Sequence, residues 1–276
     1  MTDQADLAAL HRELIDMEAS ALSLVPKHES YLRKMEALSR AIIVDVDVGA
    51  DDHFGFIAVH FHAKQLDHSK AMLLLGGHPD AMLVARTMLE GLAFLKWCHH
   101  DPAIRALRWR MFTLVRSWRA ASSAVQQGDA SRVTEMNDLS SQIGVHGDLL
   151  LSSKALKARS NKASLPADPY IRNWYDTRIS DVFAAVKGSA LYEGAYDFAS
   201  EWIHWSPDGL VSSIAITNDS LQYSSSSPVV RVSALGEAFR AVAETSITLA
   251  KHFNLERASE LEDLWNTYLD ELGSDP

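Results

Sequence analysis

A charged pair, Arg86 and Glu90, lies on an otherwise apolar stretch of the chain and is well placed to do chemistry. The two residues are four positions apart, so on a helix they share one face. Burying either charge without a partner is expensive, so we expect them to pair with each other or with groups on another helix. Two interpretations remain open. The pair is either a structural clamp or the floor of a pocket, where Arg86 binds an anion and Glu90 orients the ligand or accepts a proton.

A second set of polar side chains recurs at four-residue intervals further along the chain, at Tyr192, Tyr196, Ser200 and His204. On a helix that begins near Ser189, this spacing places them in one slowly drifting stripe. If the stripe faces the charged pair, it lines a polar cleft that offers several hydrogen-bond donors and one acid-base candidate, His204. The alternative for that histidine is a buried ring that hydrogen-bonds a backbone carbonyl.

The motifs Arg86-x-x-x-Glu90 and Tyr196-x-x-x-Ser200-x-x-x-His204 resemble those of a bacterial family of all-helical proteins of unknown function. The resemblance covers residues 50 to 250 and implies that these five side chains line a pocket, without implying a reaction. In outline, that family is similar to HEPN-type helical domains, many of which are RNases of toxin or phage-defence systems.

An RNase function carried over from that resemblance meets an obstacle in the spacing. HEPN nucleases place an arginine and a histidine on one helix, where both flank the scissile phosphate for acid-base cleavage. No arginine in this chain has a histidine five to seven residues later. An RNase or nucleotide hydrolase would have to bring His204, as general acid or base, to Arg86, which would stabilise phosphate charge from a different helix.

A basic stripe is predicted on the helix that follows Pro102. Four arginines fall within about 80° of one another at 100° per residue, namely Arg105, Arg108, Arg116 and Arg119. Trp109 and Phe112 lie beside them, and nucleic-acid backbones and bases require this mixture of cations and rings. The stripe is a weak candidate for an RNA-binding patch. The alternative is a solvated face whose arginines pair with carboxylates.

Residues 42 to 52, Ile-Ile-Val-Asp-Val-Asp-Val-Gly-Ala-Asp-Asp, resemble the D-x-D-x-G-x-D-D cluster of nucleoside hydrolases. That resemblance implies a calcium ion, held by carboxylates between Asp45 and Asp52, that activates water. The family carries its cluster near the amino terminus after a β-strand, whereas two predicted helices precede it here, and no strand-helix alternation follows. A calcium-dependent nucleoside hydrolase is therefore a minor alternative to an acidic junction between helices.

Other potential ligands are too dispersed for a metal ion. His53, His60 and His68 share one side of a predicted helix, but gaps of seven and eight residues each span two turns. The single cysteine, Cys98, lies on an apolar helix and is expected in the core. We therefore predict no metal site, and the sequence points to no particular cofactor.

Helices are expected to position all of these residues. Hydrophobic residues make up 47% of the 276 residues and charged residues 22%, as in ordinary globular proteins, while 13 Gly and 8 Pro are few for a fold of many short strands. Periodicity and helix breakers predict helices over residues 3–24, 27–44, 51–75, 79–98, 101–127, 170–187, 189–205, 229–252 and 255–271, with one more after 129. A loop is expected over 159–169, and a small hairpin or irregular segment near 211–227.

These elements predict a single all-α, multi-helix, bundle-like domain over residues 1–276. Residues 1–45 form an amino-terminal helical pair that is a candidate interaction arm, and residues 50–271 form the core. The net charge of −10 disfavours a globally basic nucleic-acid binder. The amino terminus lacks the order of a signal peptide, and no apolar run approaches the ~20 residues of a membrane span. We expect a cytoplasmic protein with no membrane partner.

Three functional hypotheses remain. The first is a binding or regulatory module for an anionic small molecule or nucleotide, in a bacterial stress or defence system. The second is a hydrolytic enzyme acting on RNA or a nucleotide, in which Glu90 and His204 are the catalytic candidates and Arg86, Tyr192, Tyr196 and Ser200 bind the ligand. The third is an interaction protein that forms a homodimer through residues 1–45.

Overall fold

The computed structural model describes residues 4–44, 46–76, 78, 80–197, 199–200, 214–217, 220–223 and 227–272. Contacts within the chain divide it into two compact units. Unit 1 comprises Met1–Val48, Ala58–Leu95 and Phe183–Pro276, and unit 2 comprises Gly49–Ile57 and Lys96–Val182. The sequence predicted one domain with its weakest join at 159–169, whereas the contacts divide the chain at other positions.

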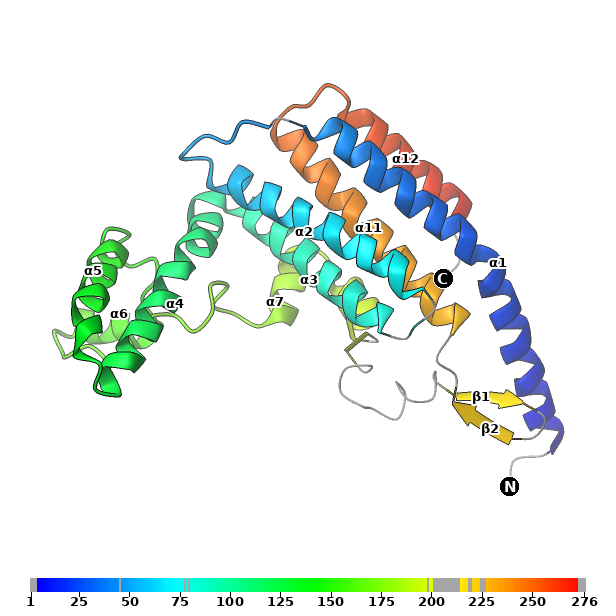
Figure 1. The fold of residues 1–276 in the computed structure, drawn as a ribbon, viewed down its shortest axis with the longest axis horizontal. Coiled ribbons are helices and arrows are strands. Elements are labelled where there is room, and N and C mark those ends of the chain that lie inside the picture. Colours follow the sequence, from blue (N-terminus) through cyan, green and yellow to red (C-terminus); the bar gives the residue numbers. More distant parts are fainter. Residues whose placement is uncertain are drawn as a thin grey trace. The chain divides into compact units, whose positions relative to one another are not determined.

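Long helices build unit 1. Helix α1 (Gln4–Ile42) runs alongside α11 (Pro228–His252) and α12 (Ala258–Leu272), as Figure 1 shows. Helices α2 (His53–Leu75) and α3 (Ala81–His100) add their apolar faces to the same core. Aromatic rings pack densely where α11 meets α12, with the centroids of Phe239 and Tyr268 3.9 Å apart. Burial of these continuous apolar stripes is what holds the helices together.

Helix α1 corrects the prediction of an amino-terminal helical pair. Pro26 lies inside one continuous helix rather than ending it. A proline removes one backbone hydrogen bond and costs ~3 kcal/mol or more in a helix interior. Burial of residues on both sides of it, including Val25, Leu32 and Met35, offsets that cost. The apolar side chains of Ile15, Met17 and Leu22 are exposed, and dimerisation through this segment stays a prediction.

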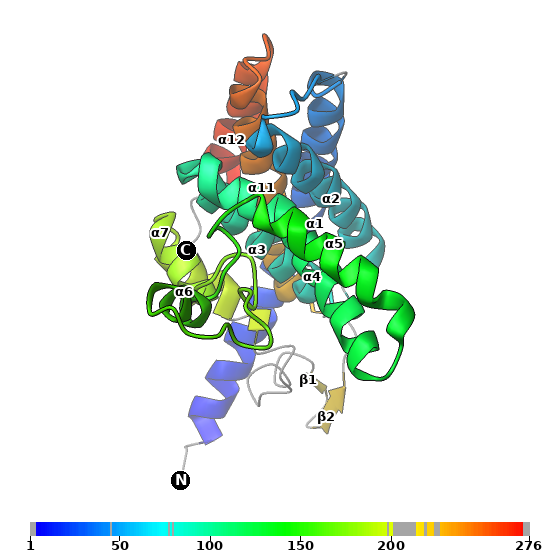
Figure 2. The same cartoon turned by 90° about the vertical axis from the view of Figure 1, so that its left-hand side faces the viewer.

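Unit 2 contains shorter elements. The π-helical turn η1 (Pro102–Ala106) leads into α4 (Leu107–Gln126), and the 3₁₀ turn η2 (Ala130–Arg132) leads into α5 (Val133–Gly144), which lies beside α4 (Figure 2). Helix α6 (Ser153–Ser160) follows. Trp118, Ile143, Leu150 and Tyr170 belong to a small core of this unit.

The predicted helix over 170–187 is wrong for most of its length, because only α7 (Ile179–Ala185) is helical. Tyr170 instead forms an isolated antiparallel bridge with Leu151, and the Ile171 N–H donates to the Leu150 carbonyl over 3.0 Å. Arg119 binds the carbonyls of Tyr170 and Ile171. A helix needs those backbone groups for its own hydrogen bonds, so these tertiary contacts exclude it.

The all-α fold class is confirmed, and so is the small hairpin near 211–227. Strands β1 (Ile214–Thr217) and β2 (Ser220–Tyr223) pair antiparallel, with Ile214 opposite Tyr223. Short helix α8 (Ser189–Leu191) and the π-helical turn η3 (Tyr192–Tyr196) precede the hairpin in the chain. No helix among the described residues is long and apolar enough to cross a membrane.

Candidate functional site

Helix α3 carries Arg86 and Glu90 on a half-buried face. Neighbouring residues Ala85 and Met88 are fully buried, whereas the two charged residues keep partial exposure. Helix α2 approaches closely beside them, since a Cβ on Gly91 would lie 3.2 Å from Nε2 of Gln65. The spacing on α3 therefore places both charges at the edge of the core of unit 1, as the sequence predicted for residues four apart.

Tyr196 bridges the two charges. The Arg86 Nη2 donates to the Tyr196 hydroxyl over 2.9 Å, and that hydroxyl donates to Oε2 of Glu90 over 3.3 Å. The Arg86 guanidinium carbon also lies 4.8 Å from the centroid of the tyrosine ring. No direct ion pair joins Arg86 to Glu90 in the part of the chain that the structure describes. The phenol thus takes the place of a salt bridge.

The hydrogen-bonding capacity of Arg86 is not filled. Its Nε is buried and has no hydrogen-bond partner among the described residues. A buried donor without a partner costs about 1–3 kcal/mol. Arg231 also has a buried Nε without a partner among these residues, but it pairs directly with the Glu29 carboxylate. What sets Arg86 apart is therefore the combination of an orphaned Nε with an Nη2 that binds only a neutral phenol.

Aromatic rings enclose the phenol. The Tyr196 ring stacks on Tyr192, with centroids 5.2 Å apart, and lies 5.0 Å from the ring of Phe183. Burial, followed by the nearby Glu90 carboxylate, raises the pKa of Tyr196 against the opposing effect of Arg86. The phenol therefore stays protonated at neutral pH, which lets it donate to Glu90 while it accepts from Arg86.

The polar stripe that begins at Tyr192 was predicted on a regular α-helix, but its first two members lie on the π-helical turn η3. Tyr192 and Tyr196 begin and end this turn, so the two rings stack directly. π-Helical turns are rare and are frequently found at functional sites. Sequence periodicity missed the turn, and its only local signal is Gly194, which has no side chain to pack and weakens a regular helix.

The remaining members of the stripe are placed differently. The Ser200 Oγ donates to the Tyr196 carbonyl over 2.7 Å, which occupies its donor within the chain's own backbone. His204 lies outside the described residues. The structure therefore brings Arg86, Glu90 and Tyr196 into direct contact, with Tyr192 added by stacking.

Residues 55–221 match the model of a family of unknown function (DUF5677). The chain belongs to this family. Searches of curated proteins and of solved structures found no match. The matched region includes Arg86, Glu90, Tyr196, Ser200 and His204, and the expectation of a helical family of unknown function is confirmed. The HEPN-like outline and the bacterial origin stay predictions.

The basic stripe of this DUF5677 protein is largely engaged in internal contacts of unit 2. Arg105 donates to the Trp97 carbonyl over 2.9 Å and stacks on its ring, and Arg108 donates to the Leu149 carbonyl over 3.1 Å. Arg119 binds the segment after α6. Arg116 is exposed. An RNA-binding role stays a prediction, and three of the four arginines also hold the fold together.

The acidic segment of residues 42–52 begins where α1 ends and precedes α2, so it does not follow a strand. Oδ1 of Asp52 accepts from the Gly55 N–H over 2.8 Å, which caps the start of α2. Among the described residues, which exclude Asp45, no group of three His, Cys, Asp or Glu side chains is placed to hold a metal ion. A nucleoside hydrolase cluster needs an α/β fold, so the all-α architecture argues against that alternative.

One polar cluster was missed by sequence reasoning. Ser39 Oγ lies 2.5 Å from His62 Nε2 and 2.7 Å from Ser246 Oγ, and all three residues are buried. Burial, with a smaller contribution from Arg40, lowers the pKa of His62 to about 4. A seryl hydroxyl beside an imidazole suggests nucleophilic catalysis, but these side chains are sealed in the core, so the cluster is structural.

Proposed function

We propose that this DUF5677 protein uses Arg86, Glu90 and Tyr196 to bind an anionic small molecule of the nucleotide class. The proposed role is that of a binding or regulatory module of a stress or defence system. The donor edge of Arg86 carries the proposal, because its Nε has no partner among the described residues and its Nη2 binds a neutral phenol instead of a carboxylate.

The shape of the guanidinium favours a ligand with paired oxygens. Nε and Nη2 lie on one edge of the planar group, and this edge matches two oxygens of a phosphate or carboxylate. Nη2 contacts the neutral Tyr196 hydroxyl rather than a carboxylate. A ligand oxygen therefore competes with a phenol, which is a weaker acceptor than a carboxylate would be.

The neighbouring groups favour a nucleotide over a simple anion. Glu90 offers carboxylate oxygens that accept from a hydroxyl or amino group of the ligand. The ring of Tyr192 stacks on Tyr196 and is only partly buried, so it supplies aromatic surface against which a base can stack, whereas Phe183 is fully buried and packs against both tyrosines. Together the site offers a donor for the anion from Arg86, an acceptor for neutral ligand groups from Glu90, and an aromatic surface for the base.

The test compares two conservative substitutions in unit 1. Arg86→Lys keeps the positive charge but removes the Nε–Nη2 edge. The matched control is Arg231→Lys, since Arg231 is also half-buried with an orphaned Nε but pairs directly with Glu29. Melting temperatures of the two variants and the wild type are measured with the four ribonucleoside triphosphates and a short single-stranded RNA.

We expect at least one nucleotide to raise the wild-type melting temperature by about 5 °C at 100-fold its Kd. Arg86→Lys should lose this rise while folding normally, and Arg231→Lys should keep it. If no nucleotide or RNA raises the melting temperature of the wild type, the cluster is a structural contact between helices. The same conclusion holds if Arg86→Lys melts at a far lower temperature without ligand and no ligand-induced rise depends on Arg86. Product analysis after incubation, repeated with His204→Ala, separates a binding module from the hydrolase alternative.

A further inference from the structure

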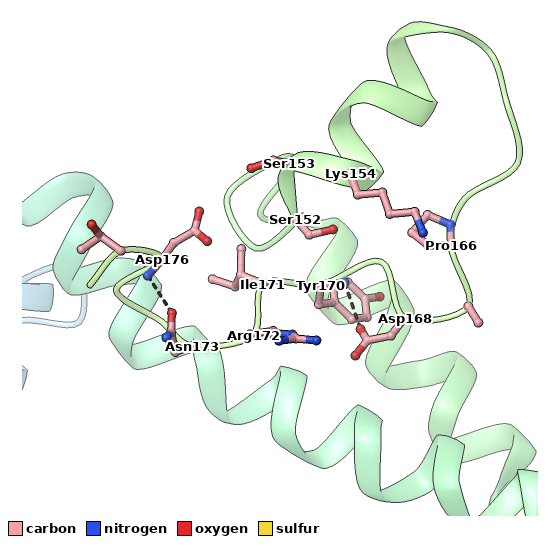
Figure 3. Close-up of a pocket in the computed structure, with 12 residues that line it drawn as sticks. Ser152, Ser153, Lys154, Pro166, Asp168, Tyr170, Ile171, Arg172, Asn173 and Asp176 are labelled. Carbon is pink, nitrogen blue, oxygen red and sulfur yellow. Dashed lines mark hydrogen bonds between the residues drawn. The ribbon is translucent and has the colours of Figure 1, made fainter. Parts of the chain in front are cut away.

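A cavity in unit 2 lies between the start of α6 and residues 166–177 (Figure 3). Its volume is about 770 Å³, within the range of pockets that hold small organic ligands. Backbone contacts fix its wall, since the Ser152 N–H and Oγ donate to the Pro169 carbonyl over 2.9 and 3.0 Å. The Tyr170 N–H donates to Oδ1 of Asp168 over 3.0 Å. These hydrogen bonds hold the backbone of two lining segments in place.

The chain around the cavity has a charge opposite to that of the whole protein. Residues 152–178 include six basic and two acidic side chains, a net charge of +4, whereas the full chain carries −10. The basic residues are Lys154, Lys157, Arg159, Lys162, Arg172 and Arg178. Arg159 pairs with Asp148 outside this range, and the remaining excess of positive charge suits an anionic ligand or partner.

Two of these cations line the cavity. Lys154 comes from α6 and Arg172 from the segment after it, and both are exposed. Among the residues that the structure describes, neither side chain has a hydrogen-bond or ion-pair partner. Asp168 does not neutralise them by a direct contact, because its carboxylate pairs with Arg119 over 2.8 Å. The cavity thus presents two cations to solvent.

An acidic side chain marks the other end. Figure 3 shows Asp176 on the opposite side of the view from Lys154. Its backbone has a φ of 47°, which is uncommon outside glycine but tolerated by Asp and Asn, and its N–H donates to Oδ1 of Asn173 over 2.9 Å. A carboxylate repels a second anion and accepts hydrogen bonds from neutral hydroxyls.

We infer that this cavity binds a phosphorylated sugar, with the phosphate held by Lys154 and Arg172 and the hydroxyl groups directed to Asp176. Lysine and arginine are the usual phosphate-binding side chains, and an open pocket of this volume admits a small molecule. This inference goes beyond the proposed function, because all of these residues belong to unit 2 and none belongs to the Arg86 cluster.

Calorimetric titration of the full chain at low salt tests the ligand class with ribose 5-phosphate, inorganic phosphate and ribose. We expect ribose 5-phosphate to bind more tightly than inorganic phosphate, and ribose not to bind. Added salt should weaken the interaction, since both cations are exposed. If none of the three binds, or if ribose binds as well as its phosphate, the inference is wrong.

Two double variants with equal loss of charge locate the site. Lys154→Gln with Arg172→Gln should weaken ribose 5-phosphate binding by about tenfold or more. The control, Lys157→Gln with Arg178→Gln, changes exposed residues outside the cavity lining and should stay within about twofold. Equal losses in the two doubles would reveal general electrostatic attraction and overturn the inference.

Single variants separate this site from the one in unit 1. Asp176→Asn keeps a residue type that tolerates the backbone conformation and should reduce the preference for ribose 5-phosphate over inorganic phosphate. Arg86→Lys should leave the titration unchanged. If Arg86→Lys instead abolishes binding, the sugar phosphate occupies the proposed site in unit 1, and the cavity assignment fails.

Discussion

Arg119 in unit 2 and Arg86 in unit 1 show two ways in which this fold uses a partly buried guanidinium. Arg119 donates to the Asp168 carboxylate over 2.8 Å and to the carbonyls of Tyr170, Ile171 and Arg172. Arg86 has one hydrogen bond, to a phenol, and a buried Nε without a partner among the described residues. One guanidinium is saturated by its own chain, and the other is left with capacity for something else.

The two arginines therefore differ in their hydrogen bonds although both are partly buried. A saturated group contributes to stability, and its removal leaves several acceptors unsatisfied. An unsaturated group contributes less to folding and retains a donor, which is the basis of the ligand proposed for Arg86. This contrast between filled and unfilled hydrogen bonds does not follow the division into units. Unit 1 also contains a polar group that the chain itself satisfies, since buried His62 lies against Ser39.

The largest expected effect is on the pH dependence of stability, and it tests whether His62 is a buried, neutral side chain. The folded-state pKa of His62 is lowered from 6.5 to about 4, so the unfolded chain binds a proton more readily than the folded one between these values. Stability from this group is therefore fully present above pH 6.5 and is lost as pH falls towards 4, by up to about 3 kcal/mol. Urea unfolding of wild type and His62→Gln across this window measures it.

His28 and His68 also have pKa values lowered by burial, so the wild-type slope alone does not isolate His62. The difference between the wild-type and His62→Gln profiles does. If the two slopes are equal between pH 6.5 and 4, His62 is not the sealed, neutral group described above.

The next effect concerns the saturated arginine. Arg119→Ala should lower the free energy of unfolding of unit 2 by about 2 kcal/mol, since a carboxylate and several carbonyls lose their donor. Hydrogen exchange should rise most at residues 170–172. Arg116→Ala, an exposed arginine on the same helix, is the control and should change stability by less than about 0.5 kcal/mol. Equal effects would remove the basis for calling Arg119 a clamp.

These contrasts also explain what the sequence predicted and what it did not. The spacing of Arg86 and Glu90 was enough to predict that they share one face, because helix periodicity is local information. That Tyr196 lies against them was implied only by the family resemblance. Arg119 looked like a member of a solvated stripe, because the carbonyls that it binds lie about fifty residues further along the chain.

Long-range contacts account for the errors in the predicted elements as well. Pro26 is an unambiguous helix breaker locally, but packing on both sides of it keeps α1 continuous. The segment around Tyr170 has helical periodicity, yet its backbone bonds Leu150 and Arg119 instead. In both cases tertiary contacts outweigh a local preference of a few kcal/mol.

The smallest expected effect decides between a clamp and a ligand site at Tyr196. Tyr196→Phe removes only the hydroxyl that bridges Arg86 and Glu90, while the ring keeps its contacts with Phe183 and Tyr192. Because Arg86 and Glu90 are only partly buried and water can replace the lost bonds, the free energy of unfolding should fall by about 1 kcal/mol. A fall of about 3 kcal/mol or more, typical of breaking a buried ion pair, would show that the bridge serves the fold, and Arg86 would then join Arg119 as a clamp.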